Sequence, residues 1–282
     1  MTRSSSRWLN WAAGLAGCVA LLLATTLRAE PLDLPAIKEK GVIRIALYKD
    51  YPPYSAGNGG IDFDIAVAIA RKLDVKLDPM WFEADENVDD DLRNMVWKGH
   101  YLGTGPADAM IHAPIDPELA RRNDRVKFVA PYFRDRLEIV RDIRKLPRLD
   151  DMSLLENETI GVEEASLASV VLLSFQGGRY RERVRHFRTP ALAIAALKRG
   201  EVAAVMAQHG EVQGMTKGES DFAVSLPPLP GAMAGRQWVV GMAVKVNHAA
   251  LGNALETAMG QLAGEGELEK IFARHGVSYV KP

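Results

Sequence analysis

The segment Gly60-Ile61-Asp62-Phe63-Asp64-Ile65-Ala66-Val67-Ala68-Ile69-Ala70 is the most informative part of the sequence for the fold. Ile65, Ile69 and Leu73 recur at intervals of four, a spacing that places apolar side chains on one face of a helix. Asp62 stands where a carboxylate can cap the first turn. The segment therefore predicts an amphipathic helix from Asp62 to Leu73 that packs one face against a core.

Short apolar runs and helical stretches alternate on both sides of this helix. Val42–Leu47 alternates and is rich in β-branched residues, which is typical of a strand, and Tyr51-Pro52-Pro53-Tyr54 predicts a turn. The same patterns predict strands over 75–80, 109–111, 128–129, 137–140, 160–162, 202–206 and 239–246, and helices over 89–97, 117–123, 166–175, 191–199, 249–263 and 267–275. This alternation favours an α/β fold with parallel sheets covered by helices.

The composition limits the possible classes of function. The chain has 282 residues, a formal net charge of −1, 48% hydrophobic residues and a single cysteine. Such a chain is neither disordered nor a polytopic membrane protein. It has no basic excess with which to bind nucleic acid. One cysteine also excludes an internal disulfide and a cysteine-rich metal site.

The N-terminus has the order of a bacterial export signal. A short basic, serine-rich head precedes the apolar run Trp8–Leu27, and a small residue, Ala29, follows it. We predict a secretory signal peptide over 1–29 and a mature protein in the periplasm. Two alternatives remain: the run is long enough for an uncleaved membrane anchor, and a lipobox-like sequence ends at Cys18, which would then carry a lipid.

Six segments in a fixed order resemble the extracellular solute-binding proteins of family 3, the amino-acid ABC transporter type. The likeness covers nearly all of the chain after the signal. The segments are Gly41–Ala46, Tyr51–Tyr54, Gly60–Ala70, Arg125–Tyr132, Ala191–Gly200 and Gly266–Phe272.

The resemblance implies a type II periplasmic-binding-protein fold, in which two α/β lobes close on a ligand. Each lobe would be a mostly parallel sheet flanked by helices. Lobe 1 would comprise 31–138 plus 235–282, and lobe 2 would comprise 143–232. Two crossovers, near Glu138–Asp142 and Pro230–Arg236, would form the hinge.

The resemblance also implies aromatic walls for a bound amino acid. It places Tyr51 and Tyr54 at these walls, and Trp81 or Phe82 near a third aromatic position. The alternative is that these rings only fill the core or the hinge.

Arg122 matches the carboxylate-binding arginine of the family by its distance from Phe128, although the loop before it is longer than in the family. A guanidinium can bind a carboxylate through two parallel hydrogen bonds. The alternative role is a surface ion pair with Glu118 or Asp124.

Two further positions concern the second lobe. Ser166 caps the next helix and could offer its hydroxyl and backbone N–H to an anion, or it could cap the helix alone. Gln208 stands where the family has an ammonium-binding acid. A buried ammonium without a carboxylate would be poorly compensated. We therefore expect a small polar or anionic solute, and not an ordinary α-amino acid.

Carboxylates are clustered over 83–91, where they could hold a hard cation such as calcium or a lanthanide. Their spacing matches no EF-hand, and a solvated helix N-terminus explains them better. We interpret His100 and His112 as loop residues. No metal and no cofactor is expected.

These observations predict a monomeric, non-catalytic periplasmic binding protein for a small solute, with an ABC permease as its partner. One alternative is an accessory protein of a periplasmic quinoprotein alcohol dehydrogenase, a branch that the resemblance includes. Another is an enzyme similar to periplasmic cyclohexadienyl dehydratases, with Glu163 or Glu164 as the acid and Arg122 on a substrate carboxylate.

Overall fold

The computed structural model describes residues 32–85, 87–230 and 237–282. The expected signal over 1–29, its cleavage site and Cys18 lie outside the described residues, and so does most of the second expected crossover. Within the described ranges, none of the helices has the length and apolar character needed to span a bilayer.

The first lobe contains a five-stranded sheet in the order β4-β1-β5-β11-β6. Its strands are β1 Val42–Tyr48, β4 Lys76–Phe82, β5 Ala109–Ile115, β6 Val126–Asp142 and β11 Gln237–Lys245, with a small hairpin of β2 Asp50–Tyr51 and β3 Ser55–Ala56. Its helices are α1 Leu34–Lys40, α2 Ile61–Lys72, α3 Val88–Leu92, α4 Pro117–Arg122, α8 Ala249–Gly264 and α9 Glu267–Arg274, and a π-helical turn, Arg93–Trp97, follows α3.

The second lobe continues from the same strand β6, in the order β6-β9-β7-β8, with β10 on the other edge of β6. Its strands are β7 Ile160–Glu163, β8 Val184–Phe187, β9 Ala204–Gln208 and β10 Phe222–Ser225. Its helices are α5 Leu167–Ser174, α6 Pro190–Lys198 and α7 His209–Thr216, with short 3-10 turns at Met152–Leu155 and Phe175–Gly177.

In each lobe a single strand is antiparallel to the others. In lobe 1, β11 is antiparallel to its neighbours β5 and β6, whereas β1 is parallel to β4 and β5. In lobe 2, β6 is antiparallel to β9 and β10, whereas β7 is parallel to β8 and β9. The expectation of two α/β lobes with mostly parallel sheets is therefore confirmed.

Helices cover both faces of each sheet, as the alternating strand pattern requires. Ile43, Ile45 and Leu47 of β1 pack with α2, α8 and α9 on one face. Ala46 points to the other face, where it meets the cluster under α3 and α4. In lobe 2, α5 covers one face, and α6 and α7 cover the other.

Strand β6 joins the lobes. It pairs with β11 as far as Arg136 and with β9 from Leu137 onward. The sequence predicts two separate strands here, over 128–129 and 137–140. Asp135 is fully buried, however, and accepts hydrogen bonds from the Tyr54 hydroxyl and the Arg136 amide, so the strand runs unbroken. The residue ranges predicted for the lobes remain predictions.

Helix α2 begins at Ile61, and its start depends on Gly60. Gly60 has φ of 110°, and a Cβ there would lie 2.3 Å from the carbonyl oxygen of Tyr54, so a residue with a side chain does not fit. The expected cap is wrong: Asp62 does not bind the helix N-terminus. Its buried carboxylate accepts a 2.6 Å hydrogen bond from the Tyr132 hydroxyl and lies 2.8 Å from His112 Nδ1.

Candidate functional site

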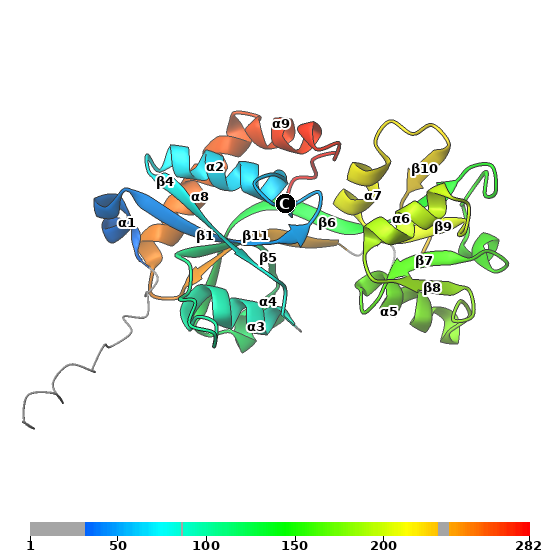
Figure 1. Cartoon of the computed structure of the whole chain (residues 1–282), viewed down its shortest axis with the longest axis horizontal. Coiled ribbons are helices and arrows are strands. Elements are labelled where there is room, and N and C mark those ends of the chain that lie inside the picture. Colours follow the sequence, from blue (N-terminus) through cyan, green and yellow to red (C-terminus); the bar gives the residue numbers. More distant parts are fainter. Residues whose placement is uncertain (1–31, 86, 231–236) are drawn as a thin grey trace, which may run out of the picture.

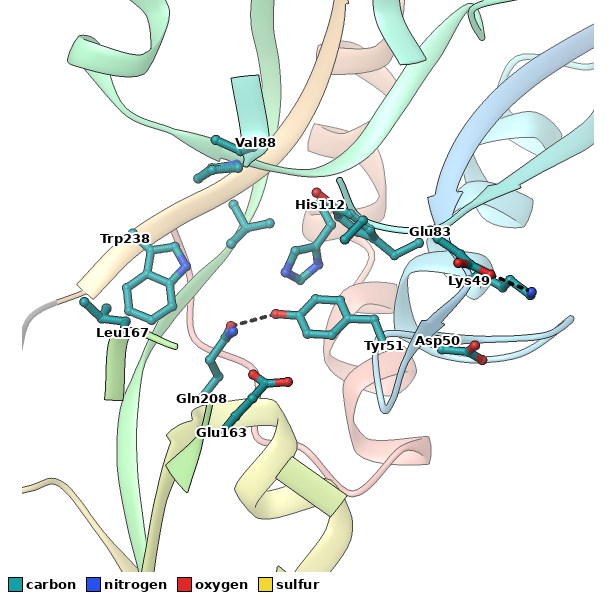
Figure 2. A pocket seen from close by; sticks show the side chains of 14 residues that line it. Lys49, Asp50, Tyr51, Glu83, Val88, His112, Glu163, Leu167, Gln208 and Trp238 are labelled. Atoms are coloured by element: carbon teal, nitrogen blue, oxygen red, sulfur yellow. Dashed lines mark hydrogen bonds and ion pairs between the residues drawn. The ribbon is translucent and has the colours of Figure 1, made fainter. Parts of the chain in front are cut away.

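A cleft of about 800 Å³ lies between the two lobes (Figure 2). Loops and strand ends of lobe 1 form most of its wall, and β7, α5 and β9 of lobe 2 supply the rest. Its lining residues are Tyr48, Lys49, Asp50, Tyr51, Glu83, Ala84, Val88, His112, Pro114, Glu163, Leu167, Gln208, Trp238 and Val240. An interlobe cleft with a few polar groups among apolar and aromatic ones is the usual form of a small-molecule site.

Aromatic rings form one side of the cleft. The ring centroid of Tyr51 lies 5.8 Å from that of Tyr48 and 5.0 Å from that of His112, both edge-on. Burial and nearby carboxylates raise the pKa of Tyr48 and of Tyr51 well above their usual values. Both hydroxyls therefore stay protonated and can donate hydrogen bonds.

A direct hydrogen bond crosses the cleft at Tyr51, whose hydroxyl donates to Gln208 Oε1 at 2.8 Å (Figure 2). Tyr51 belongs to lobe 1, and Gln208 is the last residue of β9 in lobe 2. The bond therefore links the lobes and fixes the orientation of the Gln208 amide.

We expect Tyr51→Phe and Gln208→Leu to show coupled effects on stability. Each variant removes the same hydrogen bond, so a double-mutant cycle in urea should give a coupling energy of about 1 kcal/mol. Tyr48→Phe is the matched control, because its hydroxyl donates to Asp91 at 2.8 Å within lobe 1. The effects of Tyr48→Phe and Gln208→Leu on the free energy of unfolding should be additive. If the effects of Tyr51→Phe and Gln208→Leu are additive as well, the interlobe bond does not form.

The charged groups in the lining are mostly acidic. Lys49 is the only lysine or arginine among its described residues, and its Nζ lies 3.0 Å from Glu83 Oε1. Asp50 and Glu163 add two further carboxylates. Burial raises the pKa of Glu163, whose carboxylate has no ion-pair or hydrogen-bond partner within the described part of the chain. The cleft is therefore suited to a cation or a neutral solute rather than to an anion.

A second acid, Glu211, lies beneath the cleft in a small side pocket of about 40 Å³ that Glu163 and Gln208 also line. Glu211 Oε2 accepts a 3.0 Å hydrogen bond from the backbone N–H of Gln208 at the start of α7. Burial raises the pKa of Glu211 to about 8, and the charges of Glu163 and Asp135 add to the effect. Glu211 is therefore a neutral acid near pH 7.

His112 is not a loop residue, contrary to the expectation from the sequence. It lies in β5 and lines the cleft, with a left-handed backbone (φ 63°) that is unusual for a residue with a side chain. Its ring lies between the ring of Tyr54, 4.4 Å away between centroids, and the carboxylate of Asp62. The buried contacts with Tyr54 and Asp62 therefore fix the position of the His112 ring in the aromatic wall.

The structure brings only some of the predicted site residues together. Tyr51 and Gln208 line the cleft. Tyr54 is completely buried behind the lining, where its hydroxyl donates to Asp135 at 2.9 Å. Trp81 lies away from the cleft and stacks on Phe63, with ring centroids 5.8 Å apart.

The structure does not place Arg122 in the cleft. Its exposed guanidinium lies 3.8 Å from Glu118, one of the two surface partners that the sequence offers as the alternative, and 3.3 Å from Asp89, a partner that the sequence does not suggest. Ser166 lines the side pocket, and its hydroxyl accepts a hydrogen bond from the Ser169 amide at 3.2 Å. It therefore caps α5, and whether it also meets a ligand stays a prediction.

The carboxylates of residues 83–85 and 89–91 have structural partners. Asn87 caps α3, Asp89 holds Arg122 and Asn123, and Asp91 accepts from Tyr48. Over 32–85, 87–230 and 237–282, no group of three or more His, Cys, Asp or Glu side chains is arranged to hold a metal ion.

Three solved structures with a similar fold are those of amino-acid-binding proteins. An ancestral cationic amino-acid solute-binding protein superposes with a TM-score of 0.68 at 19% identity, over 86% of this chain and 99% of that chain. An amino-acid ABC transporter substrate-binding protein of Streptococcus pneumoniae, bound to L-arginine, gives 0.62 at 19% identity, over 88% and 99%. The solute receptor for L-cysteine of Neisseria gonorrhoeae gives 0.60 at 23% identity, over 86% and 93%. The chain therefore has the fold of type II periplasmic amino-acid-binding proteins.

The comparison of the sequence itself gives one short match. No model of a known protein family matches the sequence. Cyclohexadienyl dehydratase of Pseudomonas aeruginosa is 40% identical over 65 residues, which cover 21% of this chain and 24% of that enzyme. The chain thus matches about a quarter of the length of this curated relative.

Proposed function

We propose that the protein is a periplasmic solute-binding protein of the amino-acid type, which captures a small polar solute between its lobes and is not an enzyme. The observation that carries this proposal is the interlobe cleft of about 800 Å³, which both lobes line. The fold supports it, because hinge closure on a ligand is a common use of two lobes joined at a hinge. The export signal expected over 1–29 supports the location.

The altered site favours a ligand other than an ordinary α-amino acid. Arg122, the expected carboxylate binder, lies on the surface in ion pairs with Asp89 and Glu118. Gln208, at the expected ammonium site, is neutral. An α-amino acid would therefore find neither of the two expected charged partners in its usual place.

We expect ligand binding to change the fluorescence of Trp238, which lines the cleft. The purified protein should be titrated with a panel of amino acids, amines, organic acids and sugars. Trp238→Phe should lose the signal, whereas Trp97→Phe, on the π-helical turn outside the lining, should keep it. If no solute in the panel binds the folded protein, the proposal is wrong.

A second candidate, a dehydratase, is favoured by two observations. One is the 65-residue match to cyclohexadienyl dehydratase. The other is Glu211, a carboxylic acid with a pKa of about 8 beside the cleft. Such an acid could protonate a leaving hydroxyl group, which departs as water. The scarcity of basic residues in the described lining argues against prephenate, which carries two carboxylates.

This candidate is tested by incubating the protein with prephenate. Conversion to phenylpyruvate, with release of carbon dioxide and water, that Glu211→Gln abolishes would favour the enzyme. Lack of conversion by a protein that binds a solute would remove it.

An ABC permease is the partner that solute binding implies, with the binding protein acting as a monomer. The accessory role beside a quinoprotein alcohol dehydrogenase has the sequence resemblance as its sole support. Co-purification of the protein with such a dehydrogenase from periplasm would favour that role over transport.

A further inference from the structure

We infer that the cleft recognises an organic amine that lacks a carboxylate group, and that Glu163 binds the ammonium nitrogen. The inference rests on the proposed binding function and names the substrate class of the same site. Four features of the cleft lead to it.

The first feature is the uncompensated charge of Glu163. Its carboxylate is half-buried at the end of β7, and Figure 2 shows it beside Gln208 and directed toward the ring of Tyr51. Within the described residues it has no cationic partner, and burial raises its pKa because nothing offsets the loss of water. A ligand cation would supply the missing partner.

The second feature is that the other polar groups nearby cannot replace Glu163. Gln208 is neutral, and its Oε1 accepts from Tyr51. Glu211 holds its proton near pH 7, because its pKa is about 8. Glu163 is therefore the negative group at the lobe 2 side of the cleft.

The third feature is the set of aromatic rings that share the cleft with this carboxylate. Tyr48, Tyr51 and Trp238 line the same cleft. The negative face of an aromatic ring attracts an alkylammonium group, and a carboxylate adds a charge-assisted hydrogen bond. Rings and a carboxylate together are suited to an amine.

The fourth feature is the lack of a partner for a ligand carboxylate. Among the described lining residues, Lys49 is the only lysine or arginine, and Glu83 already pairs with it at 3.0 Å. The histidine of the lining, His112, has Asp62 2.8 Å from its Nδ1. A carboxylate on the ligand would instead share the cleft with the carboxylates of Asp50, Glu83 and Glu163, which repel it. An amine should therefore bind better than the amino acid from which it differs only by that carboxylate.

Matched pairs of ligands test the inference directly. Isothermal titration calorimetry of the purified protein at pH 7 should compare tyramine with tyrosine, and cadaverine with lysine. We expect the amine of at least one pair to bind at least about 10-fold more tightly than its amino acid. A factor of this size corresponds to the cost of one unfavourable charge contact. Glu163→Gln should weaken binding of that amine about 10- to 100-fold. The control Glu164→Gln, whose exposed side chain lies outside the lining, should leave it unchanged.

The outcomes separate this inference from the proposed function. If an amino acid binds as tightly as its amine, or if only other solutes of the panel bind, the inference is wrong and the binding function stands. If the folded protein binds no solute at all, both are wrong. The comparison within each pair needs only the unchanged protein, so it decides the question even if Glu163→Gln fails to fold.

Discussion

We expect Glu211→Gln to abolish a large pH dependence of stability between about pH 4.5 and pH 8. These limits are the ordinary pKa of a glutamate and the pKa of about 8 to which burial raises Glu211. In the unfolded chain the carboxyl loses its proton near pH 4.5, whereas in the folded protein it keeps the proton up to about pH 8. Over this window the folded state binds more protons, so the free energy of unfolding falls as the pH rises.

The size of the effect follows from the width of the window. Each pH unit corresponds to ~1.4 kcal/mol, so the whole window is worth on the order of 5 kcal/mol. That is a substantial fraction of the ~5–15 kcal/mol that stabilises a typical domain. Glutamine resembles the protonated acid in shape, and its carbonyl can still accept from the Gln208 amide, but it does not titrate.

The measurement is urea unfolding of both proteins at pH 5, 6.5 and 8. The two should be similarly stable at pH 5, and the variant should become progressively more stable than the parent toward pH 8. Glu164→Gln, which changes an exposed carboxyl two residues after strand residue Val162, should follow the parent at each pH. A constant difference between Glu211→Gln and the parent across this range would contradict the buried neutral acid.

Regular elements with a strong apolar pattern could be predicted from the sequence. Strand β1 and helix α2 are examples, because burial on one face repeats with the period of the element. Helix α7 could not be predicted in this way. Gly210 adds no apolar side chain to the helical pattern. A glycine is nevertheless needed there, because a Cβ would lie 2.4 Å from the hydroxyl of buried Tyr54.

The site was harder to predict, because it depends on contacts between distant segments. Counting back from Phe128 selects Arg122, but this count does not show where the guanidinium lies in space. The loop before Arg122 is longer than the resemblance implies, and Asp89, far away in the sequence, pairs with the guanidinium. The sequence does not predict Glu211 as a site residue, although its position three residues after Gln208 has the spacing of a capping box. Spacing alone does not reveal that the carboxyl is buried beneath a cleft.

A second large effect concerns the buried charge cluster where the lobes meet. Glu138, at 3% exposure, accepts from Arg136 Nη2 at 2.8 Å and lies 2.8 Å from His209 Nδ1. His209 Nε2 in turn lies 2.8 Å from the carbonyl oxygen of Ser278 in the C-terminal segment. The cluster thus connects β6, helix α7 of lobe 2 and the C-terminus, which lies at the junction of the lobes (Figure 1).

We expect Glu138→Ala to lower the free energy of unfolding by about 3–5 kcal/mol, because it leaves buried donors of Arg136 and His209 without their carboxylate. Burial by itself would raise the pKa of Glu138, but the hydrogen bonds and charges of His209 and Arg136 outweigh it and lower that pKa. The ion pair therefore stabilises the fold above the ordinary glutamate pKa, and this contribution is lost as the pH falls below it. Glu138→Gln should have an intermediate effect, because it keeps an acceptor without the charge.

Urea unfolding at pH 7 measures the loss, and Glu201→Ala is the matched control. Glu201 also bridges two arginines, Arg185 at 3.0 Å and Arg199 at 2.6 Å, but at the surface, where water replaces the lost contact and little change is expected. Hydrogen exchange adds a local readout. Because His209 ties the start of α7 to the C-terminal segment, Glu138→Ala should accelerate exchange in α7 more than in α6, whose described residues form no hydrogen bond or ion pair with the cluster. Equal acceleration in both helices would show that Glu138 contributes only to general stability and does not hold α7 at the junction of the lobes.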